Sequence, residues 1–318
     1  MTYHILHLTT PNCKISVDKG LLVCDYKDNK TNIIPLIDIK AIIVATFGVI
    51  FTNNALSKLL ENNVTVLHCN NSYKPVGYSI PLDRIIKPKV FYNQISRNED
   101  FEQKLWKKIL KRKVLNQWEC LNLIGNKENN LLKLINKPLM NEANIARQYW
   151  QNYFIELGIS IKREHQGAET FENICLNYAY AVFNSLIYRS ILIHGLLPSL
   201  GLHHLSNYKS TPLVYDLMEP YRPFADYYLY KFSKEYEEDY DFENLKLWSK
   251  YFSNCIKDYR IKINGNSYKI VDSIEIYIEK IVQAYLNFDL EKIFLPSLKE
   301  QELLKETQEN RETANYEE

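Results

Sequence analysis

The hydrophobic period changes near residue 90, and this change divides the chain into two kinds of structure. Before it, short segments rich in β-branched residues alternate with turn residues, which is the pattern of strands and hairpins. These segments are residues 3–8, 13–17, 20–26, 32–36, 39–46 and 64–69, with a short helix capped by Asn53 or Asn54 and ending near Leu60. Beyond Pro88, apolar residues recur every three or four positions, which is the period of an amphipathic helix.

We therefore predict a series of helices after Pro88. The first follows Ser96 as its N-cap, and the others are expected over 141–157, 173–194, 211–233, 243–258 and 272–288. We predict an α+β multidomain protein in which a small N-terminal β domain is followed by a larger all-α domain. The predicted boundaries are 1–85 for the β domain, 86–95 for a linker, 96–300 for the helical domain and 301–318 for a disordered acidic tail.

Composition excludes several classes of protein. Only 9 of the 318 residues are Gly, and neither a GxxxxGK nor a GxGxxG motif is present, which disfavours the common nucleotide-binding loops. The six cysteines are scattered without a CxxC pair, which disfavours a disulfide framework or a zinc site. The longest apolar run, 41–51, is too short to cross a bilayer, and no secretory signal follows Met1. We therefore expect a cytoplasmic protein with reduced cysteines and no membrane partner.

The net charge of +1 hides an uneven distribution. Residues 1–137 hold 20 Lys and Arg against 11 Asp and Glu, whereas residues 138–318 hold 19 against 27. The densest basic stretch is 104–113, and the members that fall near one helix face are Lys104, Lys108, Lys111 and Arg112. Such a stripe can contact the phosphates of nucleic acid. An isolated charge run is more often a solvated helix face, so the stripe alone leaves both interpretations open.

Three carboxylates recur along the helix expected over 211–233. Asp216 and Glu219 are one turn apart, and at 100° per residue Asp226 projects within about 20° of Glu219. The rest of this helix is apolar, so the carboxylates must be solvated, paired or bound to metal. Arg222 and Arg147 are candidate partners. A carboxylate–arginine network that ties helices together is the structural alternative to a metal site.

Two further segments supply groups that bind hard cations. Glu142 opens the helix that holds Arg147, and His203 or His204 follows a glycine-containing turn. One neutral imidazole with carboxylate oxygens is a ligand set compatible with Mg²⁺ or Mn²⁺. Taken singly, each residue is more often structural, with the histidine capping a helix and Glu142 exposed in a first turn.

Together, these segments resemble a known family. The motifs are Glu142 within EANIARQYW, GLLP at 195–198 followed by GLHH at 201–204, and Asp216, Glu219, Arg222, Pro223 and Asp226 within DLMEPYRPFAD. In this order and spacing they resemble the universal CRISPR-associated endonuclease and integrase, CRISPR-associated protein one. The resemblance covers nearly the whole chain, and the stretch over 90–117 is most similar to members from type II systems.

The resemblance implies a catalytic site in the helical domain. The implied metal ligands are Glu142, His204 at the fourth position of G-x-x-H, and Glu219, holding Mg²⁺ or Mn²⁺. Asp216 is implied as an auxiliary catalytic carboxylate, with Asp226 positioning the site. We also predict DNA contacts from Lys104, Lys108, Lys111, Arg112, Arg147 and Arg222. Many members carry an Arg-rich loop after the histidine, but residues 205–215 here contain a single basic residue, so the chain departs from the family pattern at this loop.

The implied activity is strand transfer, in which the 3′-hydroxyl of protospacer DNA attacks a phosphodiester of the CRISPR repeat. The implied partners are double-stranded DNA, a second copy of the chain bound through the β domains, the small ferredoxin-like CRISPR adaptation protein, and other proteins of type II systems. Two alternatives from other classes are a non-catalytic DNA-binding scaffold and a stand-alone Mg²⁺-dependent nuclease unrelated to CRISPR.

Overall fold

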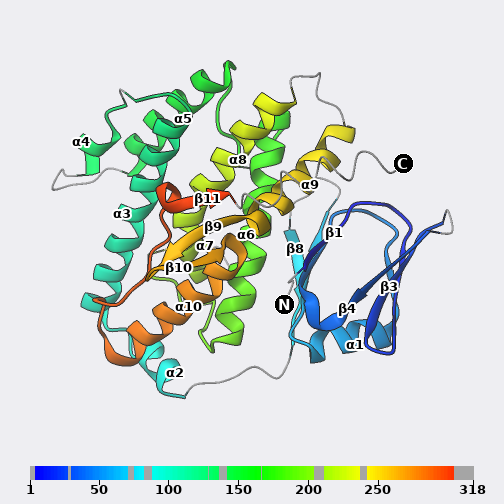
Figure 1. The fold of residues 1–318 in the computed structure, drawn as a ribbon. Helices are drawn as coiled ribbons and strands as arrows, with labels where there is room; N and C mark the ends of the chain where they lie inside the picture. The colour runs from blue at the N-terminus through cyan, green and yellow to red at the C-terminus, as the bar shows by residue number, and fades with distance from the viewer. Residues whose placement is uncertain are drawn as a thin grey trace.

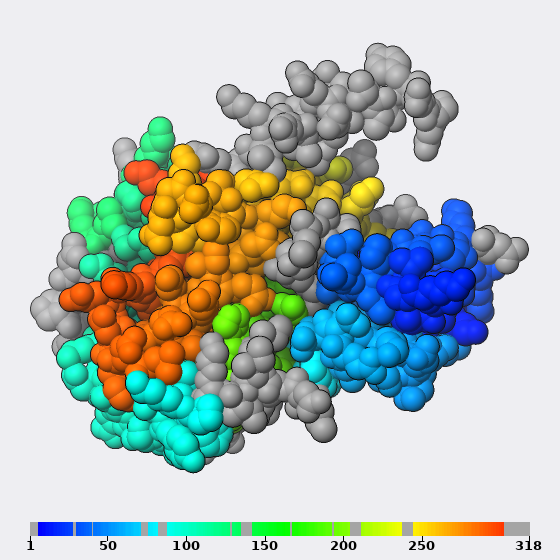
Figure 2. Space-filling view, turned by 60° about the horizontal axis from the view of Figure 1, so that its bottom comes forward, coloured from blue at the N-terminus to red at the C-terminus, as the bar shows by residue number. Residues whose placement is uncertain are grey.

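A computed structural model describes residues 4–27, 30–70, 75–81, 88–127, 129–135, 142–165, 167–203, 211–236 and 242–303. A β part is followed by a mostly helical part, as the sequence predicts. Figure 1 shows the two parts side by side, and Figure 2 shows the blue β part as a lobe beside the larger body.

Among the described residues, the β part holds two four-stranded sheets, one α-helix and a 3-10 turn, η1 (Leu36–Asp38). Its elements are β1 (His4–Leu8), β2 (Lys14–Asp18), β3 (Leu21–Asp25), β4 (Thr31–Pro35), β5 (Ile39–Val44), β6 (Ile50–Phe51), α1 (Asn53–Glu61), β7 (Thr65–Cys69) and β8 (Pro75–Ser79). The strand orders are β1-β5-β7-β8 and β4-β3-β2-β6. The Thr52 side chain accepts a hydrogen bond from the Ala55 N–H, so Thr52 is the N-cap of α1, and the predicted caps Asn53 and Asn54 are wrong.

Strands β5 and β7 join the two parts of the molecule. They pair in parallel with Ile42 opposite Val66, and both of these side chains face the core of the β part. Ala41, Ile43 and Leu67 belong instead to the core of the helical part. Both faces of these strands are therefore buried, which explains why the apolar run from residue 41 does not alternate. The same strands contact α6 (Phe171–Ile193), the long central helix.

The helical part surrounds α6 and includes a small sheet. Its other helices are α2 (Pro88–Ile95), α3 (Glu99–Leu123), α4 (Leu131–Ile135), α5 (Glu142–Leu157), α7 (Pro212–Met218), α8 (Arg222–Glu235), α9 (Phe242–Asp258) and α10 (Ile270–Asn287). The sheet has the order β10-β9-β11, from β9 (Tyr259–Ile263), β10 (Asn266–Lys269) and β11 (Gln301–Leu303). Figure 2 shows α2, in cyan, against α10, in orange, where the Asn93 amide donates to the Tyr285 carbonyl at 2.7 Å.

Several local predictions differ from the structure. The stretch predicted as a linker contains helix α2, and helix α3 is capped by Asn98, whose side chain accepts from the Phe101 N–H, so Ser96 is not its N-cap. The β9–β10 hairpin was missed although Asn264-Gly265 is a hairpin signal. Both residues have positive φ, 52° and 84°, as a tight two-residue turn requires.

The helix predicted over 211–233 is broken at the candidate site. Helices α7 and α8 are separated by a 3-10 turn, η2, over Glu219–Tyr221. Pro220 and Pro223 have no N–H, so neither can donate to the carbonyl four residues earlier, and the chain tightens to i→i+3 hydrogen bonds. The prediction of one continuous helix carrying three carboxylates on one face is therefore wrong.

The remaining general predictions concern cysteines and membranes. All six cysteines are free thiols, and five of them are buried, as expected for reduced residues. Within the part of the chain that the structure describes, no helix has both the length and the apolar character needed to cross a bilayer.

Candidate active site

Two carboxylates from separate helices converge on one lysine. The Lys113 ammonium nitrogen, from the middle of α3, lies 2.6 Å from Glu142 Oε1 and 2.7 Å from Glu219 Oε2. Glu142 is the first residue of α5, and Glu219 begins the 3-10 turn between α7 and α8. Figure 1 shows α3, α5 and α8 as neighbours. The structure therefore brings together two of the three residues predicted as metal ligands.

The Glu219 end of this cluster is buried. The Glu219 side chain is 5% exposed and that of Lys113 is 11% exposed, whereas Glu142 is 40% exposed and forms the open side. Arg222 Nε donates to Glu219 Oε1 at 3.1 Å, and its guanidinium lies over the Tyr180 ring at 4.9 Å. We call these four residues, Lys113, Glu142, Glu219 and Arg222, the ion cluster.

The two cations of the ion cluster stay charged in spite of burial. Burial alone lowers the pKa of Lys113, but the carboxylates of Glu219 and Glu142 outweigh this effect and raise that pKa above its usual value. Burial also lowers the pKa of Arg222, but Glu219, followed by Tyr180 and Asp226, raises that pKa above its usual value. The cluster thus has two negative and two positive charges. Arg222, which is predicted to contact DNA, pairs with Glu219 in this structure.

Asp216 holds the turn that precedes the predicted histidine ligand. Its Oδ2 atom accepts hydrogen bonds from the backbone N–H groups of Leu202 at 2.7 Å and His203 at 3.1 Å. The His203 ring stacks on Trp106 of α3 with 4.7 Å between ring centroids and 4° between planes. His204 lies outside the described residues. Asp216 and Trp106 therefore hold the chain in place up to His203, the residue before His204.

Gln94 fixes the start of the same loop. Its side-chain nitrogen donates to the Leu197 carbonyl at 2.9 Å, while its side-chain oxygen accepts from the Leu197 N–H at 2.8 Å. Gln94 is fully buried in α2. A buried glutamine that satisfies both backbone groups of one residue is a strong positional restraint.

Asp226 is directed at two tyrosines rather than at the ion cluster. The hydroxyls of Tyr149 and Tyr180 donate to its carboxylate oxygens, each at 2.6 Å, and the Tyr153 hydroxyl donates to its backbone carbonyl at 2.7 Å. Burial raises the pKa of Asp226 to about 6, although the two tyrosine hydrogen bonds act in the opposite direction. Asp226 therefore ties α8 to α5, the helix that begins with Glu142.

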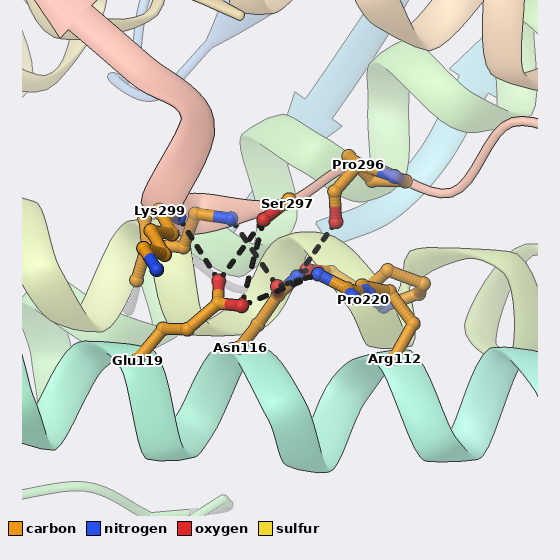
Figure 3. A network of polar contacts seen from close by, with 8 residues as sticks. Arg112, Asn116, Glu119, Pro220, Pro296, Ser297 and Lys299 are labelled. Carbon is orange, nitrogen blue, oxygen red and sulfur yellow. Dashed lines mark hydrogen bonds and ion pairs between the residues drawn. The ribbon is translucent and has the colours of Figure 1, made fainter.

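Asn116, three residues after Lys113, clamps the 3-10 turn to α3. Figure 3 shows its side chain donating to the carbonyls of Pro220 at 2.7 Å and Pro296 at 2.9 Å. Its oxygen accepts from the Leu298 N–H at 3.2 Å. The neighbouring Glu119 accepts from the Lys299 N–H at 2.9 Å, so the segment before β11 is bound to the same helix.

The residues predicted to bind DNA do not form one group. Lys104, Lys108 and Lys111 are exposed on the outer side of α3, where Lys104 pairs with Asp100 at 2.5 Å. Arg112 is mostly buried and hydrogen-bonds Asn116 and Glu119 at 3.4 Å. Arg147 is exposed on α5 and donates to Asn144 at 3.0 Å.

Sequence reasoning missed Lys113, Asn116 and Gln94. Lys113 belongs to the basic stretch, but it follows Trp106, Ile109 and Leu110 by seven, four and three residues. That spacing places it on the apolar face of the helix, and a lysine on such a face needs an acidic partner. Within the described residues no three His, Cys, Asp or Glu side chains form a metal-binding group, and the third predicted ligand, His204, falls outside that range.

Solved structures share this fold. A casposase bound to its integration product aligns with 99% of this chain and 99% of its own chain, at a TM-score of 0.79 and 16% identity. A Cas6-RT-Cas1–Cas2 complex aligns at a TM-score of 0.75 and 17% identity, over 92% of this chain and 36% of the matched chain. These likenesses define a fold shared by Cas1 proteins and casposases.

The sequence assigns the family. Residues 6–247 match the family described as CRISPR associated protein Cas1. The CRISPR-associated endonuclease Cas1 of Neisseria meningitidis is 30% identical over 221 residues, which are 67% of this chain and 70% of the relative. The chain belongs to the Cas1 family, and the resemblance found in its motifs is confirmed.

We predict that Asp226→Asn removes a pH dependence of stability. Because folding raises the pKa of Asp226 from its usual 3.8 to about 6, the folded protein favours the protonated form. The shift adds about 3 kcal/mol to the free energy of unfolding below about pH 4, and this stabilisation is lost as the pH rises through 6. Urea unfolding of both proteins at pH 4 to 7 measures the difference. Asp18→Asn, an exposed change, is the control, and a pH-independent difference would contradict the assignment.

We predict that Asn116→Ala strongly destabilises the protein. The change leaves two buried carbonyls and one buried N–H without their side-chain partner, so the free energy of unfolding should fall by about 3 kcal/mol or more. Denaturant unfolding measures this loss. Asn287→Ala, an exposed change at the end of α10, should cost far less. Equal losses for the two variants would show that the clamp contributes nothing specific.

Proposed function

We propose that this chain is a metal-dependent DNA endonuclease and integrase of CRISPR adaptation, which joins protospacer 3′-hydroxyls to the CRISPR repeat by transesterification. The observation that carries the proposal is the ion cluster. Glu142 and Glu219, from elements far apart in sequence, present carboxylate oxygens to one cation at 2.6 and 2.7 Å. Both residues stand in motifs of the family to which the chain belongs.

The comparisons support the same activity. The Neisseria relative is named an endonuclease, and the casposase is described as bound to its integration product. The fold neighbour from the Cas6-RT-Cas1–Cas2 complex is described as part of an assembly with Cas2. Hydrolysis and strand transfer differ only in the nucleophile, water or a DNA hydroxyl, so one phosphodiester site serves both.

The residues present fit a divalent cation. Two carboxylates held against one ammonium show that the protein already stabilises a positive charge between them. Carboxylate oxygens are the preferred ligands of Mg²⁺ and also bind Mn²⁺, and one imidazole is compatible with Mn²⁺. Glu142, Glu219 and His204 would hold the ion, which when bound would polarise the phosphoryl oxygen and lower the pKa of the attacking hydroxyl.

The chain's own residues prepare the site for this step. Arg222 neutralises Glu219 and fixes its orientation, while Asp216 and Gln94 hold the turn that leads to His204. In the reaction, the 3′-oxygen forms a bond to phosphorus, and the bond between phosphorus and the repeat's leaving oxygen breaks. The attacking hydroxyl gives up its proton, and the leaving oxygen takes up a proton, so the number of protons is unchanged. The charge that builds on the phosphoryl oxygens favours a cationic, preorganised site.

We also propose the partners and organisation that the family implies. The β domain would form a homodimer, which is supported by its large exposed apolar side chains Ile33, Ile37, Phe47 and Ile50. The residues that would contact double-stranded DNA of the protospacer and repeat are Lys104, Lys108, Lys111, Arg112, Arg147 and Arg222. A small ferredoxin-like adaptation protein and, in a type II system, other proteins of that system would complete a cytoplasmic assembly.

We predict that each proposed metal ligand is essential for joining DNA. Glu142→Ala, His204→Ala and Glu219→Ala should each lower half-site integration of a short duplex into a plasmid with a repeat array by about a hundredfold or more. Glu61→Ala, an exposed change in the β part, is the matched control and should retain activity. Assays with Mn²⁺, with Mg²⁺ and with a chelator measure the metal requirement.

The same assay distinguishes the alternatives. Near-normal integration by Glu142→Ala and His204→Ala would contradict the ligand assignment. DNA binding by the wild type without any metal-dependent reaction would favour a scaffold, and hydrolysis without joining would favour a stand-alone nuclease.

We predict that Asp216 acts mainly through the backbone that it holds. Asp216→Asn keeps a carbonyl oxygen able to accept from Leu202 and His203, whereas Asp216→Ala has no acceptor. Integration should therefore fall less than about tenfold in Asp216→Asn and about a hundredfold in Asp216→Ala. Equal losses in the two variants would show that the charge of Asp216, rather than its hydrogen bonds, is required.

A further inference from the structure

Lys113 is an interior residue of α3 rather than a member of its exposed basic stripe. Its side chain is 11% exposed, and its neighbours on the same helix face, Ile109 and Leu110, are buried in the main core. Lys107, Lys108 and Lys111 of the same helix are exposed. An ammonium group held this far from water requires close anionic partners, and Glu142 and Glu219 supply them.

Lys113 occupies the oxygens that a metal would need. It contacts Glu142 Oε1 and Glu219 Oε2, whereas Arg222 binds the other Glu219 oxygen, Oε1. A divalent cation placed between these carboxylates would meet the ammonium at close range, and the repulsion between two positive charges is large where water is excluded. Because the two cations repel each other at this range, a metal bound between these carboxylates would displace Lys113.

The charge of the ion cluster indicates where the ammonium goes. Two carboxylates with Lys113 and Arg222 sum to zero, so a bound divalent cation leaves the cluster with a charge of about +2. A phosphodiester brings one negative charge, and a second develops as the nucleophile attacks. The flexible lysine side chain, with its three donors, can reorient toward such a phosphate without leaving the site.

We propose that Lys113 is a catalytic residue that exchanges partners: it neutralises Glu142 and Glu219 in the metal-free enzyme and binds the reacting phosphate once these carboxylates hold the metal. This inference rests on the proposed function. It means that the metal and DNA bind cooperatively, because each compensates the charge that the other leaves unbalanced. By linkage, DNA then tightens metal binding by the same factor by which metal tightens DNA binding.

Lys113→Met separates these effects, because methionine has a similar length and no charge. Binding of Mn²⁺ to the full-length protein without DNA, followed by electron paramagnetic resonance, should become tighter by about tenfold or more, since the competing cation is gone. Half-site integration at saturating Mn²⁺ should fall by about a hundredfold. Lys58→Met, an exposed change in α1 of the β part, is the control. Lys113→Arg, which keeps the charge, should restore part of the activity.

A second measurement uses the native protein and does not depend on a variant that folds. Labelling with an amine-reactive reagent, read by mass spectrometry, should modify Lys113 slowly in the metal-free protein and faster after Mn²⁺ alone is added. Addition of a short DNA duplex should then protect it again. Lys58, exposed on α1, serves as the internal reference.

The outcomes separate this inference from the proposed function. Wild-type protein that neither binds Mn²⁺ nor joins DNA would contradict the proposed function itself. If the wild type does both, unchanged or weaker Mn²⁺ binding by folded Lys113→Met, or labelling of Lys113 that Mn²⁺ leaves unchanged, would overturn the role of Lys113.

Discussion

The pairing of Lys113 with Glu142 and Glu219 is the interaction on which the rest of the site depends. Charges this poorly exposed to water are tolerated only when their partners are held in place. Most of the surrounding polar contacts serve that requirement. Asn116 fixes the turn that begins with Glu219, and the Asp226–Tyr149 hydrogen bond fixes the helix that begins with Glu142. The same helix, α3, supplies both Lys113 and the Asn116 clamp.

Two prolines give three neighbouring carboxylates three different roles. A regular helix would align Asp216, Glu219 and Asp226, but Pro220 and Pro223 tighten the chain into a 3-10 turn. Glu219 then enters the ion cluster, Asp216 holds the backbone before the histidine, and Asp226 binds tyrosines in the core. The family motif therefore combines one proposed ligand with two residues that position other elements.

The sequence predicts the architecture better than it predicts which side chains meet. The change of hydrophobic period near residue 90 separates the two parts correctly, because burial enforces the pattern in each element. The meeting of Glu142 with Glu219 follows only from the family resemblance, since a contact across 77 positions leaves no local signal. Lys113 was predicted neither as a DNA contact nor as a site residue. It lies within a run of basic residues, and only its spacing from Trp106, Ile109 and Leu110 distinguishes it as a core position. The 3-10 turn was missed because helical spacing was extended through Pro220.

We propose that Glu142 and Glu219 form a cation site that Lys113 occupies before the metal binds. A crystal structure of the protein with Mn²⁺, using the anomalous signal of manganese, would locate the ion relative to these residues. We expect one strong peak bonded to the carboxylates of Glu142 and Glu219, with the Lys113 ammonium turned away from both. Manganese bound elsewhere, with Lys113 still paired to both carboxylates in protein that joins DNA, would contradict the account.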